Sequence, residues 1–354
     1  MARLRDILQQ ASAEKDAPDR FVTAQAPTEP GEERAAPQDP STLHEESDLP
    51  STHAVSIVPL ESQRLYSELL AASQRLVDDV HRHQPVTVGD VPSLVERLIA
   101  MLRCDDGELM RLSVAEESAY FLASHLVNVA ILAVRVGLEC GLQASPLREL
   151  GVAALLHDLG MARIADVVDV PAALDQLQME VVRQHPLLGQ QLLDGCEEVS
   201  PAVRELVSQE HEREDGSGYP NRLRGQAVQA SAQVLGLVDV YEALTHDRPH
   251  RRRLIPSEAI RMVVASQRTA FRQEFLRAFL QAVPIFPVGS WVRLKTGELA
   301  RVSRVRQATP LTPIVEVMVD SFGLPCAKPQ THDLAKEPLA RTIVEGIPAP
   351  SVDR

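Results

Sequence analysis

The chain has 354 residues, of which 44% are hydrophobic, 24% charged and only 3% aromatic. These proportions are ordinary for a soluble globular protein, and the scarcity of aromatic residues favours helix-on-helix packing. The formal net charge of -13 argues against duplex nucleic acid as a partner, because that partner needs a basic face. It leaves room for a small anionic ligand, since bound cations can reverse the local field.

Residues 1–54 are rich in Pro, Glu, Asp, Ser and Ala and carry few large apolar side chains, so we expect a disordered tail. From residue 55 onward, apolar positions recur at helical spacing, which predicts an N-terminal helical segment over 55–114. Residues 115–283 form the next predicted unit, with helices near 115–138, 147–156, 203–212, 232–244 and 256–282. The pairs Ser145-Pro146 and Ser200-Pro201 favour helix starts.

The pattern changes after Pro284, where apolar and polar residues begin to alternate. This alternation predicts a small β module over residues 284–340, with strands near 291–294, 300–305 and 314–319. The sequence therefore predicts a mainly α protein with a small C-terminal β module and a disordered N-terminal tail.

The cysteines are scattered and form no CxxC pair: Cys104, Cys140, Cys196 and Cys326. We interpret them as reduced thiols, which favours a cytoplasmic location. The longest apolar stretch, Leu126 to Cys140, is interrupted by Asn128 and Arg135 and is short for a bilayer. We expect no membrane insertion.

Histidines and acids recur at inward positions of the predicted helices. The histidines are His125, His157, His185 and His211. A single histidine of this kind is usually a core residue, but Asp158 directly follows His157, and Glu210 and Asp239 also fall on apolar faces. Because burying an uncompensated carboxylate costs several kcal/mol, a shared cation is the best explanation for the set. Mixed imidazole and carboxylate ligands suit Fe, Mn, Co, Ni or catalytic Zn.

Four sequence strings, in order, give a specific resemblance. They are HDLG at 157–160, QHPLLG at 184–189, EHEREDGSGYP at 210–220 and VDVYEALTHDRPHR at 238–251. Together they resemble the signatures of the HD-GYP family, the cyclic di-GMP phosphodiesterases among HD-domain phosphohydrolases. The segment FPVGSWVRLKTGELARV at 286–302 is similar to the β tail that often follows this domain.

The resemblance implies an HD-domain helical bundle that binds two divalent metal ions, with Fe or Mn expected. The implied metal ligands are His125, His157, Asp158, His185, Glu210, His211 and Asp239. Asp158 would bridge the two metals, and Asp158 with His157 would form the catalytic core. The implied substrate-binding residues are Asp215, Gly216, Gly218, Tyr219, Pro220, Arg248 and Arg251.

The implied reaction is hydrolysis of cyclic di-GMP to linear pGpG, with a second cleavage to GMP left open. A water acidified by the cations would attack phosphorus in line. The resemblance also suggests a role in bacterial signalling, with signalling proteins such as diguanylate cyclases as partners. Oligomeric state does not follow from the sequence.

Two departures from the family pattern leave alternatives open. Met161 occupies the position of the lysine in HDxGK, so a positive charge near the phosphate is missing. Arg163 is a nearby candidate to replace that charge. Glu210 replaces the first histidine of an HH pair, which leaves one metal or two open. Phe121 replaces a carboxylate that holds a third metal in some members, which favours two metal ions.

The sequence leaves two alternative functions open. One is a degenerate domain that binds cyclic di-GMP or a protein without catalysis. The other is an HD phosphohydrolase for another nucleotide.

Overall fold

The computed structural model describes residues 60–104, 107–114, 121–165, 175–247, 251–306, 309–337 and 341–350. The predicted disordered tail and residues 115–120 lie outside these ranges. Val58–Arg354 forms one compact unit. Its described part confirms the predicted architecture of many helices followed by a small antiparallel sheet.

The helices run in chain order as follows: α2 (Leu60–His81), α3 (Val91–Cys104), α4 (Gly107–Leu112), α5 (Phe121–Glu139), α6 (Ala144–Leu156), α7 (Leu159–Arg163), α9 (Gln176–Val182), α10 (His185–Asp194), α11 (Pro201–Gln209), the 3-10 turn η1 (Gly225–Ala227), α12 (Ala230–Thr245), α13 (Pro256–Ser266) and α14 (Gln273–Ala282). The apolar period predicted most of them. The expected helix over 256–282 is wrong as a single element, because 267–272 interrupt it between α13 and α14.

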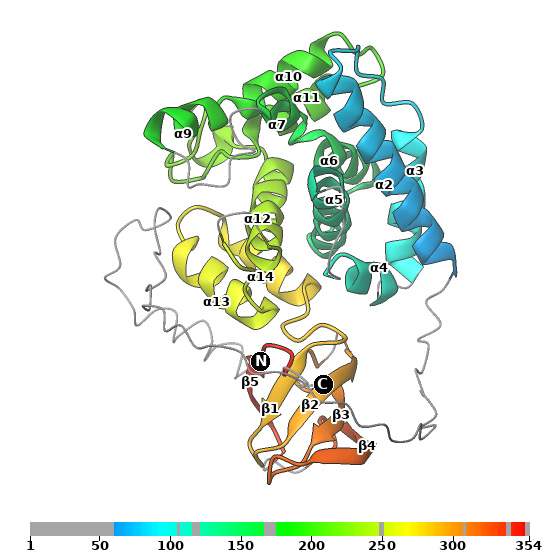
Figure 1. Cartoon of the computed structure of the whole chain (residues 1–354). Coiled ribbons are helices and arrows are strands. Elements are labelled where there is room, and N and C mark those ends of the chain that lie inside the picture. The colour runs from blue at the N-terminus through cyan, green and yellow to red at the C-terminus, as the bar shows by residue number, and fades with distance from the viewer. Residues whose placement is uncertain are drawn as a thin grey trace, which may run out of the picture. The chain divides into compact units, whose positions relative to one another are not determined.

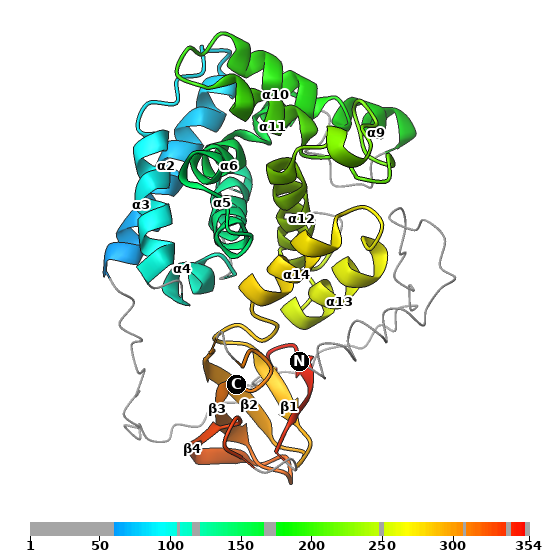
Figure 2. The ribbon, with the colours of Figure 1, turned by 180° about the vertical axis from the view of Figure 1, so that it is seen from behind.

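Helix α5 forms the centre of the bundle. It packs against α2, α6 and α12, and both views in Figures 1 and 2 show it between α2 and α12. The helix has 19 residues, and an 18-residue stretch of it has a mean hydropathy of 1.8, so by length and composition it could cross a membrane. However, 78% of that stretch is buried within the protein. Its apolar surface therefore serves as the core of the helical bundle.

Two predicted helix starts have different outcomes. Ser200 caps α11, because its side chain accepts a hydrogen bond from the Val203 amide. Ser145 does not cap α6: the helix begins at Ala144, two residues before Pro146, and Gln143 stands at the cap position without a side-chain bond. A serine–proline pair fits the first helical turn as well as the cap, so the pair alone does not fix the boundary.

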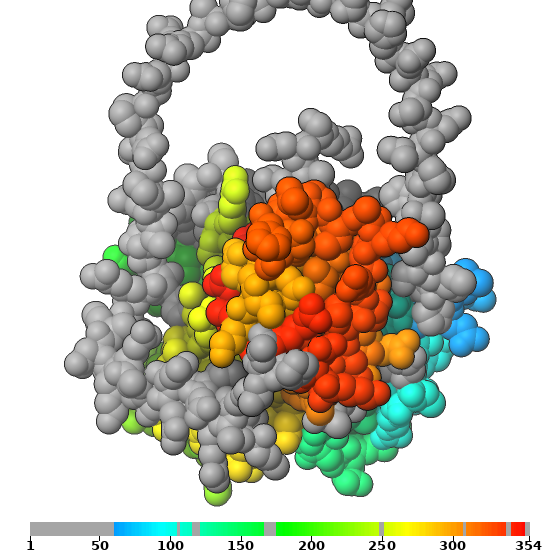
Figure 3. All heavy atoms as spheres, turned by 90° about the horizontal axis from the view of Figure 1, so that it is seen from below, coloured from blue at the N-terminus to red at the C-terminus, as the bar shows by residue number. Residues whose placement is uncertain are grey.

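The C-terminal module is a five-stranded sheet with the order β4-β3-β2-β1-β5. Its strands are β1 (Trp291–Leu294), β2 (Leu299–Arg304), β3 (Ile314–Val319), β4 (Pro325–Asp333) and β5 (Ile343–Ile347), all paired antiparallel. The first three strands were predicted, whereas β4 and β5 were not, because none of their side chains is fully buried and they show no apolar alternation. In Figure 3 the atoms of this module, orange to red, lie together on the face shown.

Candidate metal centre

The predicted metal ligands come from separate helices, and most stand at helix ends. His125 lies in the first turns of α5, and Asp239 lies within α12. The others stand where one helix ends or the next begins: His157 at the end of α6, Asp158 before α7, His185 at the start of α10, and Glu210 and His211 after α11. Packing of the helices in the bundle therefore brings these side chains together.

Two glycines allow the helices to approach closely enough for this. A side chain at Gly160 of α7 would place its Cβ 2.0 Å from the carbonyl oxygen of His185. A side chain at Gly236 of α12 would place its Cβ 2.2 Å from the carbonyl oxygen of Glu210. Neither distance is compatible with a Cβ atom, so glycine at these positions lets α7 meet α10, and α12 meet the end of α11.

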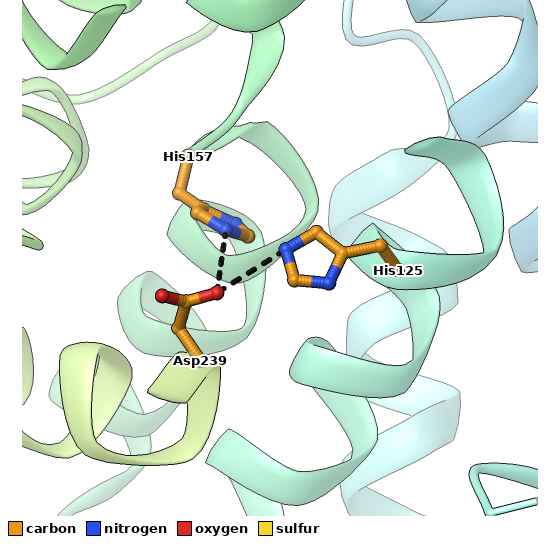
Figure 4. A group of neighbouring side chains, drawn as sticks. All are labelled: His125, His157 and Asp239. Atoms are coloured by element: carbon orange, nitrogen blue, oxygen red, sulfur yellow. Dashed lines mark ion pairs between the residues drawn. The ribbon is translucent and has the colours of Figure 1, made fainter. Parts of the chain in front are cut away.

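The first group of candidate ligands contains His125, His157 and Asp239, whose ligand atoms lie within 4.8 Å of one another. Figure 4 shows both rings directed toward the carboxylate of Asp239. Oδ1 of Asp239 lies 3.2 Å from Nε2 of His125 and 3.9 Å from Nε2 of His157. All three side chains are buried. Two imidazoles and one carboxylate form a donor set that suits a transition metal.

The second group contains His185, Glu210 and His211, also within 4.8 Å of one another. Oε2 of Glu210 lies 3.0 Å from Nε2 of His211 and 3.7 Å from Nε2 of His185. Glu210 is fully buried. The glutamate that departs from the family pattern therefore takes its place in a ligand group, where a carboxylate oxygen stands instead of an imidazole nitrogen.

Asp158 faces both groups with one carboxylate. Its Oδ2 lies 3.4 Å from Nε2 of His125 and 3.8 Å from Nε2 of His157. Its Oδ1 lies 3.2 Å from Nε2 of His185. The two oxygens of a single side chain thus point to different groups, which is the arrangement that a bridging ligand requires.

Hydrogen bonds on the outer side of three rings fix which nitrogen faces the centre. Nδ1 of His157 donates to the Ala154 carbonyl at 2.9 Å, and Nδ1 of His185 donates to the Val182 carbonyl at 2.7 Å. Nδ1 of His125 bonds the Glu242 carboxylate at 2.5 Å. Each ring thereby turns its Nε2 toward the centre, as outer partners of metal-binding histidines commonly arrange.

The inward atoms have no hydrogen-bond partner, although they are buried. This holds for Nε2 of His125, His157 and His185 and for both carboxylate oxygens of Glu210. Buried polar groups are normally satisfied, because leaving one unpaired costs about 1–3 kcal/mol. Divalent cations between these atoms would satisfy them, so the residues fit the metal ions that the resemblance implies.

Proton affinities in the centre are strongly perturbed. Burial opposes ionisation of Asp158, but the neighbouring His157, His125 and His185 outweigh it and hold the pKa of the carboxyl well below its usual range. For His125, burial favours the neutral ring, yet the charge of Glu242 and the other carboxylates raises the pKa well above its usual value. In the metal-free protein, a proton on the His125 ring therefore balances the charge of ionised carboxylates such as Asp158, and cation binding would displace that proton.

The segment Asp215–Pro220 folds back over the second ligand group. The ring of Tyr219 stacks on His211, with centroids 4.5 Å apart and planes inclined by 25°. The Tyr219 amide donates to the His211 carbonyl at 3.2 Å. Gly218 is required here, because a Cβ atom would lie 2.4 Å from that carbonyl, and Gly216 has a φ of +80°. The loop thus holds an aromatic ring beside the candidate ligands.

Asp215, Arg251 and Arg163 make contacts that sequence reasoning did not anticipate. The exposed Asp215 accepts hydrogen bonds from Ser217 and Thr269, so its carboxylate shapes the loop. Arg251 donates to main-chain carbonyls near the end of α12, including Leu244 at 3.3 Å. Exposed Arg163 contacts His83 in the turn after α2. Arg248 lies outside the described residues.

Sequence reasoning missed the part played by two buried glutamates. Glu212 accepts the amides of Asn221 at 2.6 Å and Leu223 at 2.8 Å, and so anchors the segment that follows Pro220. Glu242 is the partner of His125 described above. Position along the helix held a signal for Glu242, because it follows Asp239 by three residues and shares its inward face.

The family comparison agrees with this geometry. The model of the HD domain family matches residues 97–273, and that of a KOW domain associated with the HD domain matches residues 291–345. The chain belongs to the HD domain family. The KOW match falls on the β module that the sequence predicted.

Two of the relatives are cyclic di-GMP phosphodiesterases by name. The cyclic di-GMP phosphodiesterase PA4108 of Pseudomonas aeruginosa is 32% identical over 85% of this chain and 74% of its own length. The cyclic di-GMP phosphodiesterase response regulator RpfG of Xanthomonas campestris is 32% identical over 45% of this chain and 43% of its own length. This chain thus spans less than half of RpfG.

A solved structure shares the fold. The HDG"Y"P protein Bd1817 of Bdellovibrio bacteriovorus aligns with a TM-score of 0.51 over 64% of this chain and 73% of its own, at 13% identity. The helical fold expected from the resemblance, and the recognition of the HD-GYP family, are both confirmed.

Proposed function

We propose that this protein hydrolyses cyclic di-GMP to linear pGpG with two divalent cations, and a second cleavage to GMP stays open. The observation that carries the proposal is the single carboxylate of Asp158, which faces two groups of three candidate ligands. The names of the relatives PA4108 and RpfG support the substrate and favour hydrolysis over binding alone.

The residues of the centre would have different roles. His125, His157 and Asp239 would hold one cation, and His185, Glu210 and His211 the other. Bound cations supply charge that polarises a phosphodiester and acidifies a water. Asp158 would keep the cations adjacent. Tyr219, stacked on His211, offers a ring at the edge of the centre for a guanine base, next to the backbone of Gly216 and Gly218.

The donor set favours Mn or Fe as the cations. Each group combines imidazole nitrogens with a carboxylate, and the centre contains no cysteine. Glu210 adds a hard oxygen ligand where the family pattern has a nitrogen, and harder ligands shift preference toward such ions. We further propose a cytoplasmic protein of bacterial signalling, with diguanylate cyclases among its partners, because their product would be its substrate.

The decisive experiment compares the wild type with Asp158→Ala. The full chain, purified under reducing conditions, is loaded with Mn²⁺ or Fe²⁺ and given cyclic di-GMP, and the linear product is measured by chromatography. A parallel reaction contains 3'3'-cGAMP, because phosphodiesterases specific for it are also relatives. We expect the wild type to form pGpG, and Asp158→Ala to lose both metal and turnover.

A matched control is Asp194→Ala, which removes an exposed aspartate from the end of α10 and should keep metal and turnover. Wild-type rates from metal-free Asp158→Ala would overturn the proposal. So would a metal-loaded wild type that binds cyclic di-GMP and returns it intact.

A further inference from the structure

A chain of hydrogen bonds connects helix α2 to the candidate metal centre. The hydroxyl of Tyr66 donates to Oδ1 of Asn128 at 3.0 Å. Nδ2 of Asn128 donates to Oε1 of Glu242 at 3.2 Å. Oε2 of Glu242 bonds Nδ1 of His125 at 2.5 Å, and the Nε2 of that ring faces Asp158 and Asp239.

Neighbouring members of this chain hold one another in place. The carboxylate of Glu242 only accepts hydrogen bonds, so it turns the NH₂ group of Asn128 toward itself. Oδ1 of Asn128 then accepts from the Tyr66 hydroxyl, which anchors the amide from its other side. Glu242 uses one oxygen for Asn128 and the other for His125, and His246 lies 3.1 Å from the first oxygen. The carboxylate is thereby held in one position, and it sets the plane of the His125 ring.

Burial makes these bonds consequential. Asn128, Glu242 and His125 are 3%, 2% and 2% exposed, so water cannot easily replace a lost partner. Burial and the charge of Glu242 raise the pKa of Tyr66 to about 12. The hydroxyl therefore keeps its proton, and can act as the donor, at every pH at which the protein would be studied.

We propose that Tyr66 is a positioning residue of the metal centre, which holds the ligand His125 in place through Asn128 and Glu242. This inference rests on the proposed function. Tyr66 lies on α2, outside residues 97–273 that match the HD domain family. It follows that α2 belongs to the functional unit and is more than a covering helix.

The test measures Mn²⁺ affinity of the full chain by equilibrium dialysis under reducing conditions. Tyr66→Phe removes one hydroxyl and keeps the ring. We expect its affinity for the more weakly held Mn²⁺ to fall roughly tenfold, the lower end of the effect of outer partners on metal sites. The matched control is Tyr241→Phe, because the hydroxyl of Tyr241 is buried without a hydrogen-bond partner, and its removal should leave affinity unchanged.

A double-mutant cycle separates positioning from a merely structural role. Glu242→Gln removes the charge through which Tyr66 acts, so adding Tyr66→Phe to it should lower affinity little further. Equal losses from Tyr66→Phe with and without Glu242→Gln would overturn the inference, as would wild-type affinity in Tyr66→Phe. A wild type that binds no Mn²⁺ would sink this inference and the proposed function together. One that binds Mn²⁺ but leaves cyclic di-GMP intact would sink only the proposed function.

Discussion

Met161 lies on α7, three residues after Asp158, where the family pattern has lysine. Its amide donates to the Asp158 carbonyl at 2.9 Å, so its backbone follows the start of the helix and only the side-chain charge is missing. The other nearby candidate, Arg163, is exposed and contacts His83. The position that holds lysine in the family pattern therefore carries no charge here, and Arg163 at the end of α7 contacts His83.

The substitution Met161→Lys tests how much a positive charge at this position increases the rate. A fixed positive charge stabilises the negative charge that develops at phosphorus in the transition state, so we expect kcat for cyclic di-GMP to rise roughly tenfold or more. Steady-state kinetics at saturating Mn²⁺ measure it. Met161→Leu is the control, since it keeps the size and adds no charge. Equal rates for the two variants would show that charge at this position does not limit the reaction.

At the scale of elements, the centre depends on close contact between short helices. Helix α7 has only five residues and carries no independent stability. It is held against α10 because Gly160 has no side chain, and this contact places Asp158 3.2 Å from His185. The place of the Asp158 carboxylate between the two ligand groups is thus a property of helix packing.

Gly160→Ala should disrupt this packing. The new Cβ would overlap the His185 carbonyl, so α7 and α10 must separate, and we expect a loss of about 2 kcal/mol in the free energy of unfolding. Mn²⁺ binding should weaken in parallel. Urea unfolding followed by circular dichroism measures the first effect, and dialysis the second.

Gly195→Ala provides the matched control for that experiment. A Cβ at Gly195 would meet nothing within 4 Å, and the backbone φ of -83° suits alanine. We expect unchanged or slightly higher stability. If Gly160→Ala were as stable as Gly195→Ala and bound Mn²⁺ equally well, the contact between α7 and α10 would not hold the centre together.

At the scale of the whole molecule, the negative charge of the protein affects how an anionic substrate can bind. The chain carries a formal net charge of -13, and the centre gathers the carboxylates of Asp158, Glu210, Asp239 and Glu242. An anionic dinucleotide would be repelled by such a site without counter-charge. Bound cations reverse the local field, so metal binding should precede and enable substrate binding.

Acid should weaken the β module through a defined ion pair. Arg341 donates to both oxygens of Glu298, at 2.7 and 3.1 Å, and these bonds lower the pKa of Glu298. A carboxyl whose pKa is lower in the folded state stabilises that state above its unfolded pKa. The stabilisation by Glu298 is lost as the pH falls from the pKa of the unfolded chain through the lower pKa of the folded protein.

At pH 7 we therefore expect the wild type to unfold at a higher urea concentration than Glu298→Gln. The free energies of unfolding should differ by at most about 1 kcal/mol, because the pair is near the surface. This difference in the free energy of unfolding between the two proteins should become smaller below pH 4.5. Trp291, the single tryptophan, lies in β1, so its fluorescence follows this module. A difference independent of pH would show that the ion pair is not the source of the stability.

The sequence by itself determined the chemistry and the class of fold. Helical periodicity marked most of the bundle, because a helix that buries one face repeats its apolar residues locally. The candidate ligands were also visible, since buried acids such as Asp158 and Asp239 need a counter-charge wherever they lie. The HDLG and DGSGYP strings then indicated the HD-GYP family.

Only the tertiary structure decided which ligands meet. It divided them into two groups, turned the two oxygens of Asp158 toward different groups, and assigned Glu242 to His125. It also directed Arg251 to the end of α12 and linked Tyr66 to the centre. These relations join residues far apart in the chain. They depend on how close and at what angle the helices pack, and no local sequence pattern specifies that.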